Sequence, residues 1–266
     1  MNKLLLRGIS GAVYCAIIII AILFGTDYIS ILTILFSVIG YVEFSKITGI
    51  LCRKRMPVIL LDIAGCIALS MWAYILPVLF WVVIVLMRAI MELYMKEDSP
   101  IKSMAFSIFS QIYIGGALGS MIAFPEWLSL PKILLAIFLF IWINDTGAFL
   151  VGSAIGHHRL FERISPKKSW EGFWGGMVFC LIASWIFGEY CQDFFGTNVS
   201  LPVWGGLGLL CSIFATWGDL FESLIKRTLH IKDSGNIIPG HGGILDRIDS
   251  LLFVAPASLI YLLLII

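Results

Sequence analysis

The segment 132–152, KILLAIFLFIWINDTGAFLVG, decides the class of fold. Residues 133–143 are all apolar, and a helix of about 20 residues crosses a hydrocarbon core of ~30 Å at 1.5 Å per residue. Asn144 and Asp145 nevertheless stand near the middle of the segment. A charged side chain at that depth needs a partner or a cation. The segment therefore predicts a membrane helix that carries part of a functional site.

The rest of the chain has the same apolar character. Hydrophobic residues make up 60% of it and charged residues 13%, and the mean hydropathy is +0.99. Soluble domains have about a quarter of their residues charged, so these values predict an all-α, polytopic integral membrane protein. We expect about nine transmembrane helices, the first of them retained and not cleaved as a signal. They are placed at 4–24, 28–48, 57–74, 76–95, 103–123, 132–152, 170–190, 203–227 and 246–266.

Lysine and arginine are distributed unevenly between the loops. Lys132 is the only basic residue of one set of loops, and Arg88 falls inside a predicted helix. The alternate loops hold Lys3, Arg7, Lys46, Arg53, Lys54, Arg55, Lys96, Lys102, Arg159, Arg163, Lys167, Lys168, Lys226, Arg227, Lys232 and Arg247. Because positive residues stay inside, the N-terminus is predicted to be cytoplasmic and the C-terminus to lie outside. Every candidate functional loop then faces the cytoplasm.

The polar residues at membrane depth are concentrated in the second half of the chain. We expect a single membrane domain over 1–266, with a helical scaffold at 1–125 and a catalytic region at 140–250. In the scaffold, Arg88 and Glu92 are four residues apart and are interpreted as a structural ion pair, with contact to a lipid phosphate as the alternative. Glu43 is expected at the membrane interface. The six cysteines lack metal-type spacing and are expected to behave as small apolar residues.

Two helices in the catalytic region present carboxylates. At 100° per residue, an arc of roughly 100° at the end of the eighth helix holds Asp219, Glu222, Ser223 and Lys226. At the start of the ninth, Asp246 and Asp249 are about 60° apart, and Arg247 lies between them. The alternatives are a snorkelling helix end and carboxylates that complement a helix dipole. Hard oxygen ligands from two helices favour a magnesium site.

A glycine-rich loop joins these two helices. It includes Gly235, Gly240, Gly242 and Gly243, together with His241. Glycines let backbone N–H groups approach phosphate oxygens closely, so the loop is a candidate cradle for a polyphosphate. His241 is interpreted as a phosphate contact, with general acid catalysis and loop packing as alternatives.

A second polar block follows Asn144 and Asp145. Ser165 and Pro166 are expected to be the N-cap and the first residue of the seventh helix. Lys167 and Lys168 would then lie in its first turn, where bases oppose the helix dipole and phosphate binding would explain them. Positive-inside anchoring is the alternative interpretation.

At these residues the chain resembles the phosphatidate cytidylyltransferase family, also called CDP-diacylglycerol synthases. Upstream, the similar residues are Asn144-Asp145, Ser165-Pro166-Lys167-Lys168 and Glu171-Gly172; the first 130 residues match only as generic helices. The C-terminal family pattern is matched without a gap by Ser223, Lys226, Arg227, Lys232, Asp233, Gly235, Pro239, His241, Gly242, Gly243, Asp246, Arg247 and Asp249.

The resemblance implies transfer of the cytidylyl group of CTP to phosphatidate, which gives CDP-diacylglycerol and pyrophosphate. The implied catalytic residues are Asp219, Asp246, Asp249 and Lys226. Mg²⁺, with a second cation left open, would be held by Asp219, Asp246, Asp249 and Asp145. Substrate would contact Lys167, Lys168, Ser223, Arg227, Lys232, His241, Gly242, Gly243, Arg247 and Asn144.

The expected partners are CTP and phosphatidate as substrates, and membrane lipids. No nucleic acid partner is expected, and self-association into a homo-oligomer is left open. The expected location is the cell (plasma) membrane, with the site facing the cytoplasm. Two other functions are weighed: CTP-dependent transfer to another lipid acceptor, and a cation transporter whose path is lined by Asp145, Asp219 and Asp246.

Overall fold

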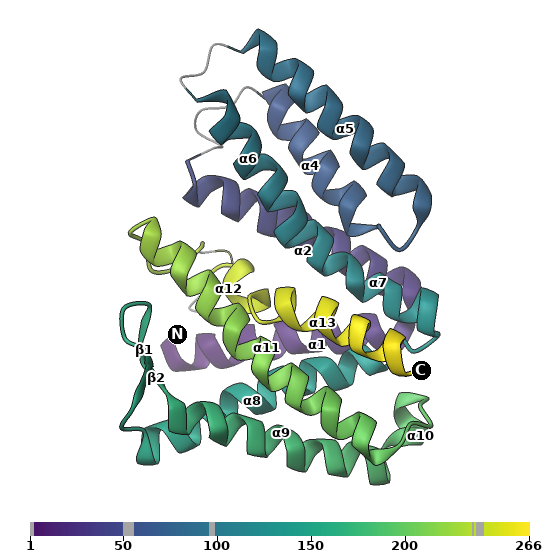
Figure 1. Ribbon diagram of the computed structural model, residues 1–266, viewed down its shortest axis with the longest axis vertical. Coiled ribbons are helices and arrows are strands. Elements are labelled where there is room, and N and C mark those ends of the chain that lie inside the picture. Colours follow the sequence, from purple (N-terminus) through teal and green to yellow (C-terminus); the bar gives the residue numbers. More distant parts are fainter. Residues whose placement is uncertain (1–2, 50–55, 96–98, 236, 238–241) are drawn as a thin grey trace. The chain divides into compact units, whose positions relative to one another are not determined.

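The structure is a computed structural model that describes residues 3–49, 56–95, 99–235, 237 and 242–266. The chain forms two compact units (Figure 1). The first comprises Met1–Trp127 and Ile231–Arg247, and the second Leu128–His230 and Ile248–Ile266. The single-domain organisation stays a prediction.

The first unit is built from apolar helices. A π-helical turn, η1, interrupts its longest helical stretch, and there the indole N–H of Trp72 donates to the carbonyl of Gly116 at 2.7 Å. The indole N–H of Trp81 donates to the Gln111 side chain of the same turn at 2.8 Å, so two tryptophans fix it. The elements are α1 (Lys3–Phe24), α2 (Thr26–Ile47), α4 (Met56–Ser70), α5 (Ile75–Tyr94), α6 (Pro100–Ser110), η1 (Gln111–Gly116), α7 (Ala117–Leu128) and α12 (Leu245–Ile248).

A buried ionic network ties together four helices of this unit. Arg88 on α5 pairs with Glu92 on the next turn, and its Nε lies 3.3 Å from Asp62 Oδ1 on α4. Its Nη2 donates to Ser103 Oγ on α6 at 2.9 Å. Tyr41 on α2 donates its hydroxyl to Asp62 Oδ2 at 3.1 Å. Since Arg88 is 1% exposed, the structural ion pair is confirmed and contact with a lipid phosphate is not what the structure shows.

Replacing Arg88 with Met is therefore expected to destabilise the protein strongly. It leaves the carboxylates of Asp62 and Glu92 buried without their base, a change that costs about 3–5 kcal/mol. The measurement is unfolding of the purified protein in mild detergent. Lys102→Met, at an exposed position of α6, is the control, and its free energy of unfolding is expected to stay within about 0.5 kcal/mol of the parent. Equal stability of the two variants would contradict the network.

The second unit consists of a helical bundle and one hairpin. Helices α8, α9 and α11 lie side by side, and α13 packs on α11 (Figure 1). Asn144 on α8 is buried and accepts from Ser212 Oγ on α11 at 2.7 Å, so a polar contact joins the helices at this depth. The elements are α8 (Ile133–Ile155), β1 (Arg159–Phe161), β2 (Ser165–Ser169), α9 (Trp170–Tyr190), α10 (Gln192–Phe195), α11 (Leu201–Thr228) and α13 (Leu251–Ile265).

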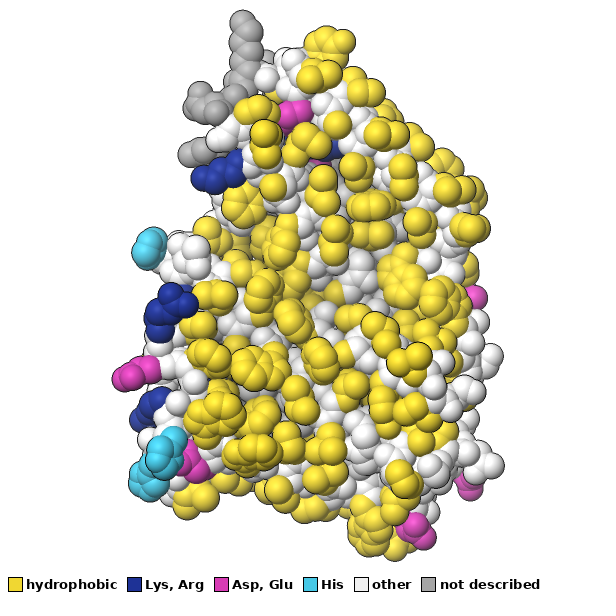
Figure 2. All heavy atoms as spheres, viewed as in Figure 1, with side chains coloured by type: hydrophobic (Ala, Val, Ile, Leu, Met, Phe, Trp, Pro, Cys, Tyr) yellow, Lys and Arg dark blue, Asp and Glu magenta, His cyan; other side chains and the backbone are white. Residues whose placement is uncertain are grey.

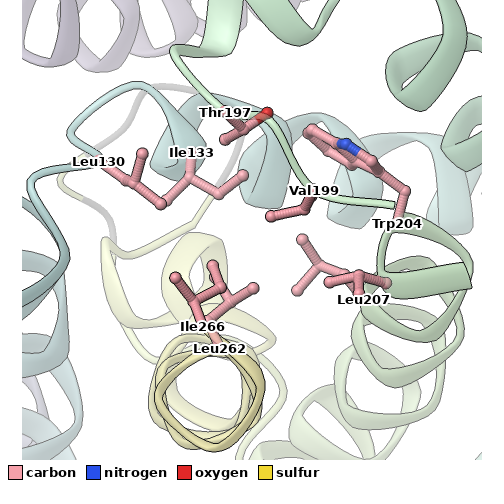
Figure 3. Close-up of a pocket in the computed structure, with 9 residues that line it drawn as sticks. Leu130, Ile133, Thr197, Val199, Trp204, Leu207, Leu262 and Ile266 are labelled. Carbon is pink, nitrogen blue, oxygen red and sulfur yellow. The ribbon is translucent and has the colours of Figure 1, made fainter. Parts of the chain in front are cut away.

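A small pocket in the second unit belongs to this packing (Figure 3). It lies at the other end of α11 from Asp219, and its lining includes Trp204, Leu207 and Leu262. No ionisable side chain lines it, so it offers nothing for phosphate chemistry. We assign it to the apolar interior of the bundle.

The all-α membrane fold is confirmed. Among the described residues, seven helices are long and apolar enough to cross a membrane, while Gly8–Phe24 and Met56–Ser70 are shorter apolar helices. Each of the nine predicted segments corresponds to one of these. Figure 2 shows a face covered mostly by hydrophobic side chains, as a surface in contact with lipid requires. The count of nine spans and the sides of the two termini stay predictions.

The predicted N-cap of the seventh helix is wrong, although its predicted range, 170–190, agrees with α9. Ser165–Ser169 is a strand, antiparallel to Arg159–Phe161, and the helix begins at Trp170. Its N-cap is Ser169, whose Oγ accepts from the Gly172 N–H at 3.1 Å. Pro166 is compatible with either structure, because its fixed φ suits an edge strand as well as the first turn of a helix. Lys167 and Lys168 therefore lie on a strand and not in the first helical turn.

Candidate active site

Asp219 is the centre of a polar cluster in the second unit. It lies in the second half of α11, the end predicted to face the cytoplasm. Its Oδ2 accepts from Lys168 Nζ on β2 at 2.7 Å. Ser223, one turn along, donates its hydroxyl to Asp219 Oδ1 at 3.2 Å. The side chains of Lys168 and Asp219 are 27% and 34% exposed, so the protein itself does not enclose either. The predicted lysine and aspartate of two distant sequence blocks thus meet directly.

Asp249 joins the same cluster. It lies in the turn between α12 and α13, and the N–H of Ser250 donates to its Oδ1 at 2.6 Å. Asp249 interacts electrostatically with Asp219, Glu222 and Asp145. Four carboxylates that repel one another in a partly buried place create a strong demand for positive charge.

A glycine on α11 makes this approach possible. A Cβ added at Gly218 would lie 2.7 Å from the carbonyl oxygen of Asp249 and 3.0 Å from Cα of Ser250. Both neighbours are backbone atoms, which cannot rotate away. Ser250 Oγ also donates to the Ala215 carbonyl at 3.0 Å, so the contact is fixed on both sides of Gly218. Asp249 can therefore approach the Asp219 turn only if residue 218 has no side chain.

Replacing Gly218 with Ala is expected to lower the free energy of unfolding by about 1–3 kcal/mol, because the helix and the Asp249 turn must move apart. Gly205→Ala on the same helix is the control, since nothing lies within 4 Å of its added Cβ. Alanine in an open helical position is expected to stabilise by up to about 1 kcal/mol. Unfolding in detergent measures both variants, and a neutral or stabilising Gly218→Ala would contradict the close contact.

Two other predicted site residues of the second unit, Lys226 and Arg227, contact residues of the same unit. Lys226 pairs with Glu222 on the preceding turn of α11. The Nε of Arg227 donates to the Ile164 carbonyl at 3.3 Å and so holds the hairpin to α11. Lys167 is exposed on β2, and Asp145 is exposed on α8. The predicted substrate contacts of these residues and of Asn144 stay predictions.

Asp246 lies in the first unit and organises the glycine-rich loop. Its Oδ2 accepts from the Gly243 N–H at 2.8 Å, and from the N–H and Oγ of Ser234, both at 2.9 Å. Gly242 has a φ of +85°, a conformation that favours glycine. The described ends of the loop, at Ser234 and Gly243, are therefore both held by an aspartate of the chain itself.

The remaining predicted residues of the loop are placed only in part. Lys232 and Arg247 are exposed, and the hydroxyl of Tyr14 on α1 donates to the Arg247 carbonyl at 3.1 Å. His241 lies outside the described residues, so its predicted phosphate contact stays a prediction. Gly242 and Gly243 are described, but the phosphate contacts predicted for them also stay predictions.

Sequence reasoning missed the contact of Glu43. It was expected at the membrane interface, but it is 2% exposed and binds the start of α12. Its partners lie about 200 positions away in the chain. The available signal was a carboxylate in a largely apolar helix, which is a reason to expect a partner.

Comparison with known proteins identifies the family. The model of the cytidylyltransferase family matches residues 5–265, and the chain belongs to this family. Curated relatives named phosphatidate cytidylyltransferase come from Staphylococcus aureus (strain COL), 43% identical over 152 residues, and Staphylococcus haemolyticus (strain JCSC1435), 41% identical over 154. Each alignment covers 57% of this chain and 56% of the relative, so the chain is matched to somewhat more than half the length of these proteins.

Proposed function

We propose that the protein transfers the cytidylyl group of CTP to phosphatidate, giving CDP-diacylglycerol and pyrophosphate. The observation that carries the proposal is the meeting of Lys168 with Asp219 beside Asp249, in a chain of the cytidylyltransferase family. The relatives' name supplies the substrate, phosphatidate. The cluster supplies a positive charge, on Lys168, and negatively charged carboxylates, on Asp219 and Asp249, that can hold a cation.

The chemistry sets the task of these residues. Phosphatidate is a phosphate monoester, which is largely dianionic near neutral pH, since the second pKa of such a phosphate is about 6. No side chain therefore has to remove a proton from the attacking oxygen. The obstacle is repulsion between this anion and the triphosphate, which positive groups placed in advance can offset. Lys168, Lys226 and Arg227 are the bases of the second unit that we assign to this role.

Magnesium fits the donor chemistry of the cluster. Carboxylate oxygens are the ligands it prefers, and we assign Asp145, Asp219 and Asp249 as the residues that would hold it. No three His, Cys, Asp or Glu residues in the described parts of the chain converge closely enough to form a complete metal cage. Magnesium commonly uses one or two carboxylates together with substrate phosphates and water, so a cage is not needed. When bound, the ion would neutralise charge on the triphosphate.

The orientation is part of the same proposal. We infer that the cluster faces the cytoplasm of the cell membrane, with the N-terminus on that side. The support is the distribution of lysine and arginine. The loops predicted to lie outside hold only Lys132, and the loops on the other side hold nearly all the rest. CTP is a cytoplasmic solute, and the partial exposure of Lys168 and Asp219 is compatible with its access from water.

The test is release of pyrophosphate by the purified protein in detergent. Release is expected only when CTP, phosphatidate and Mg²⁺ are all present, and EDTA or omission of the lipid should abolish it. Release that does not depend on phosphatidate would indicate CTP hydrolysis. A folded preparation that binds CTP and releases nothing with phosphatidate would favour another lipid acceptor.

A further inference from the structure

Glu43 connects the helical scaffold to the glycine-rich loop within the first unit. Its Oε1 accepts from the Ile244 N–H at 3.0 Å, and its Oε2 accepts from the Leu245 N–H at 2.8 Å. Ser234 Oγ lies 3.3 Å from the same Oε2. One carboxylate on α2 therefore receives donors from both ends of the segment 234–245.

Two glycines near the described ends of the loop lie close to this carboxylate. A Cβ added at Gly235 would lie 2.6 Å from Glu43 Oε1, and one added at Gly243 would collide with Glu43 Oε2 and with Ser234 Oγ. Two glycines of the segment are thus required by one side chain of the scaffold. The side chain is 2% exposed, so its hydrogen bonds do not compete with bulk water.

Ser234 couples this contact to Asp246. Its Oγ lies 2.9 Å from Asp246 Oδ2 and 3.3 Å from Glu43 Oε2, and its own N–H also donates to Asp246. The two carboxylates together receive the N–H groups of Gly243, Ile244 and Leu245, which are consecutive. The backbone from Gly243 to the first turn of α12 is consequently fixed, and with it the positions of Gly242 and Asp246.

We propose that Glu43 is a positioning residue for nucleotide binding: it holds the end of the glycine-rich loop, Gly243–Leu245, in the conformation that receives the triphosphate of CTP. The inference rests on the proposed function. Glu43 itself does not contact substrate, because its carboxylate is occupied by backbone N–H groups and is buried. Its effect passes through the loop to the groups that meet the phosphates.

The test is Glu43→Gln, which keeps the size of the side chain but replaces one acceptor oxygen by an NH₂ group that opposes a backbone N–H. The KM for CTP is expected to rise by about 10-fold to 100-fold, with a smaller change in the KM for phosphatidate. Amide hydrogen exchange of the peptide 242–250 is expected to become faster in the variant. Glu43→Asp, which keeps both oxygens, should recover part of the CTP affinity.

Glu92→Gln is the matched control. It also changes a buried glutamate of the first unit, but its partner is Arg88 in the scaffold network. It is expected to lower stability and to leave the KM for CTP within 2-fold. Should Glu43→Gln fail to fold, Ser234→Ala removes one donor of the same contact and is expected to raise the KM for CTP in the same direction.

The outcomes separate this inference from the proposed function. Fast exchange in 242–250 with an unchanged KM for CTP would overturn the positioning role. If 242–250 exchanges as slowly in Glu43→Gln as in the parent protein, the carboxylate does not hold this segment, and the positioning role is likewise overturned. If the parent protein turns over no CTP with phosphatidate, the proposed function fails. The exchange of 242–250 and CTP affinity measured by direct binding still decide the role of Glu43.

Discussion

Replacing Asp219 with Asn is expected to lower kcat/KM for CTP by about 10²–10³-fold, the usual effect of removing one electrostatic group from an active site. The variant loses the negative charge that Lys168 Nζ meets at 2.7 Å. It keeps an oxygen that can accept from Ser223, and the shape of the side chain is unchanged. Membrane insertion and unfolding should therefore stay close to those of the parent, while pyrophosphate release falls.

The control for this prediction is Asp193→Asn, which removes an exposed carboxylate of α10 in the same unit. Its activity is expected to stay within 2-fold of the parent. Turnover by Asp219→Asn at a comparable level would remove Asp219 from the catalytic machinery. Lys168→Ala removes the other partner of the same ion pair, and its pyrophosphate release is expected to fall as well.

Asp246 is expected to show the second large effect, and two substitutions separate its roles. Asp246→Asn can still present an oxygen to the N–H groups of Ser234 and Gly243, so we expect the loop to stay folded. Asp246→Ala removes the acceptor and leaves these donors without a partner, at a cost of about 1–3 kcal/mol for a buried donor. Both are expected to lose at least about 100-fold in kcat/KM, if the charge of Asp246 acts on the metal-bound nucleotide.

Pyrophosphate release and unfolding in detergent distinguish the two variants. An active and stable Asp246→Asn, beside an inactive and unstable Asp246→Ala, would show that Asp246 serves the loop alone. The charge would then have no part in the reaction, and the prediction that Asp246 is a metal ligand would be wrong.

The helical fold could be predicted because its signals are local. Long apolar segments marked the described helices that are long enough to cross a membrane and the two shorter apolar ones, but not the four-residue α10, and the predicted range 170–190 agrees with α9 at both ends. The hairpin 159–169 was not predicted. Ser165-Pro166 is a good start for a helix, and nothing nearby showed that Ser169 would cap the helix instead. Pairing with 159–161, which decides the matter, is a contact between segments.

The candidate site was predictable as a set of residue types and less so as a set of contacts. Helical periodicity placed Asp219 and Ser223 on one face, and the structure confirms this, because the Ser223 hydroxyl donates to Asp219 Oδ1. The pairing of Lys168 with Asp219 joins residues about 50 positions apart, and spacing along the sequence does not reveal it. Glu43 lay furthest from prediction, because its role depends entirely on the distant residues Ile244 and Leu245.

The most direct test of the central claim is the fate of radioactive phosphate from CTP. The purified protein is given phosphatidate, Mg²⁺ and CTP labelled with ³²P at either the α or the γ position, and the lipid is extracted. Attack of the lipid phosphate on the α-phosphorus predicts that α-label enters the lipid and that γ-label stays in the water-soluble pyrophosphate. Label from the γ position in the lipid would identify a CTP-dependent kinase and would contradict cytidylyl transfer.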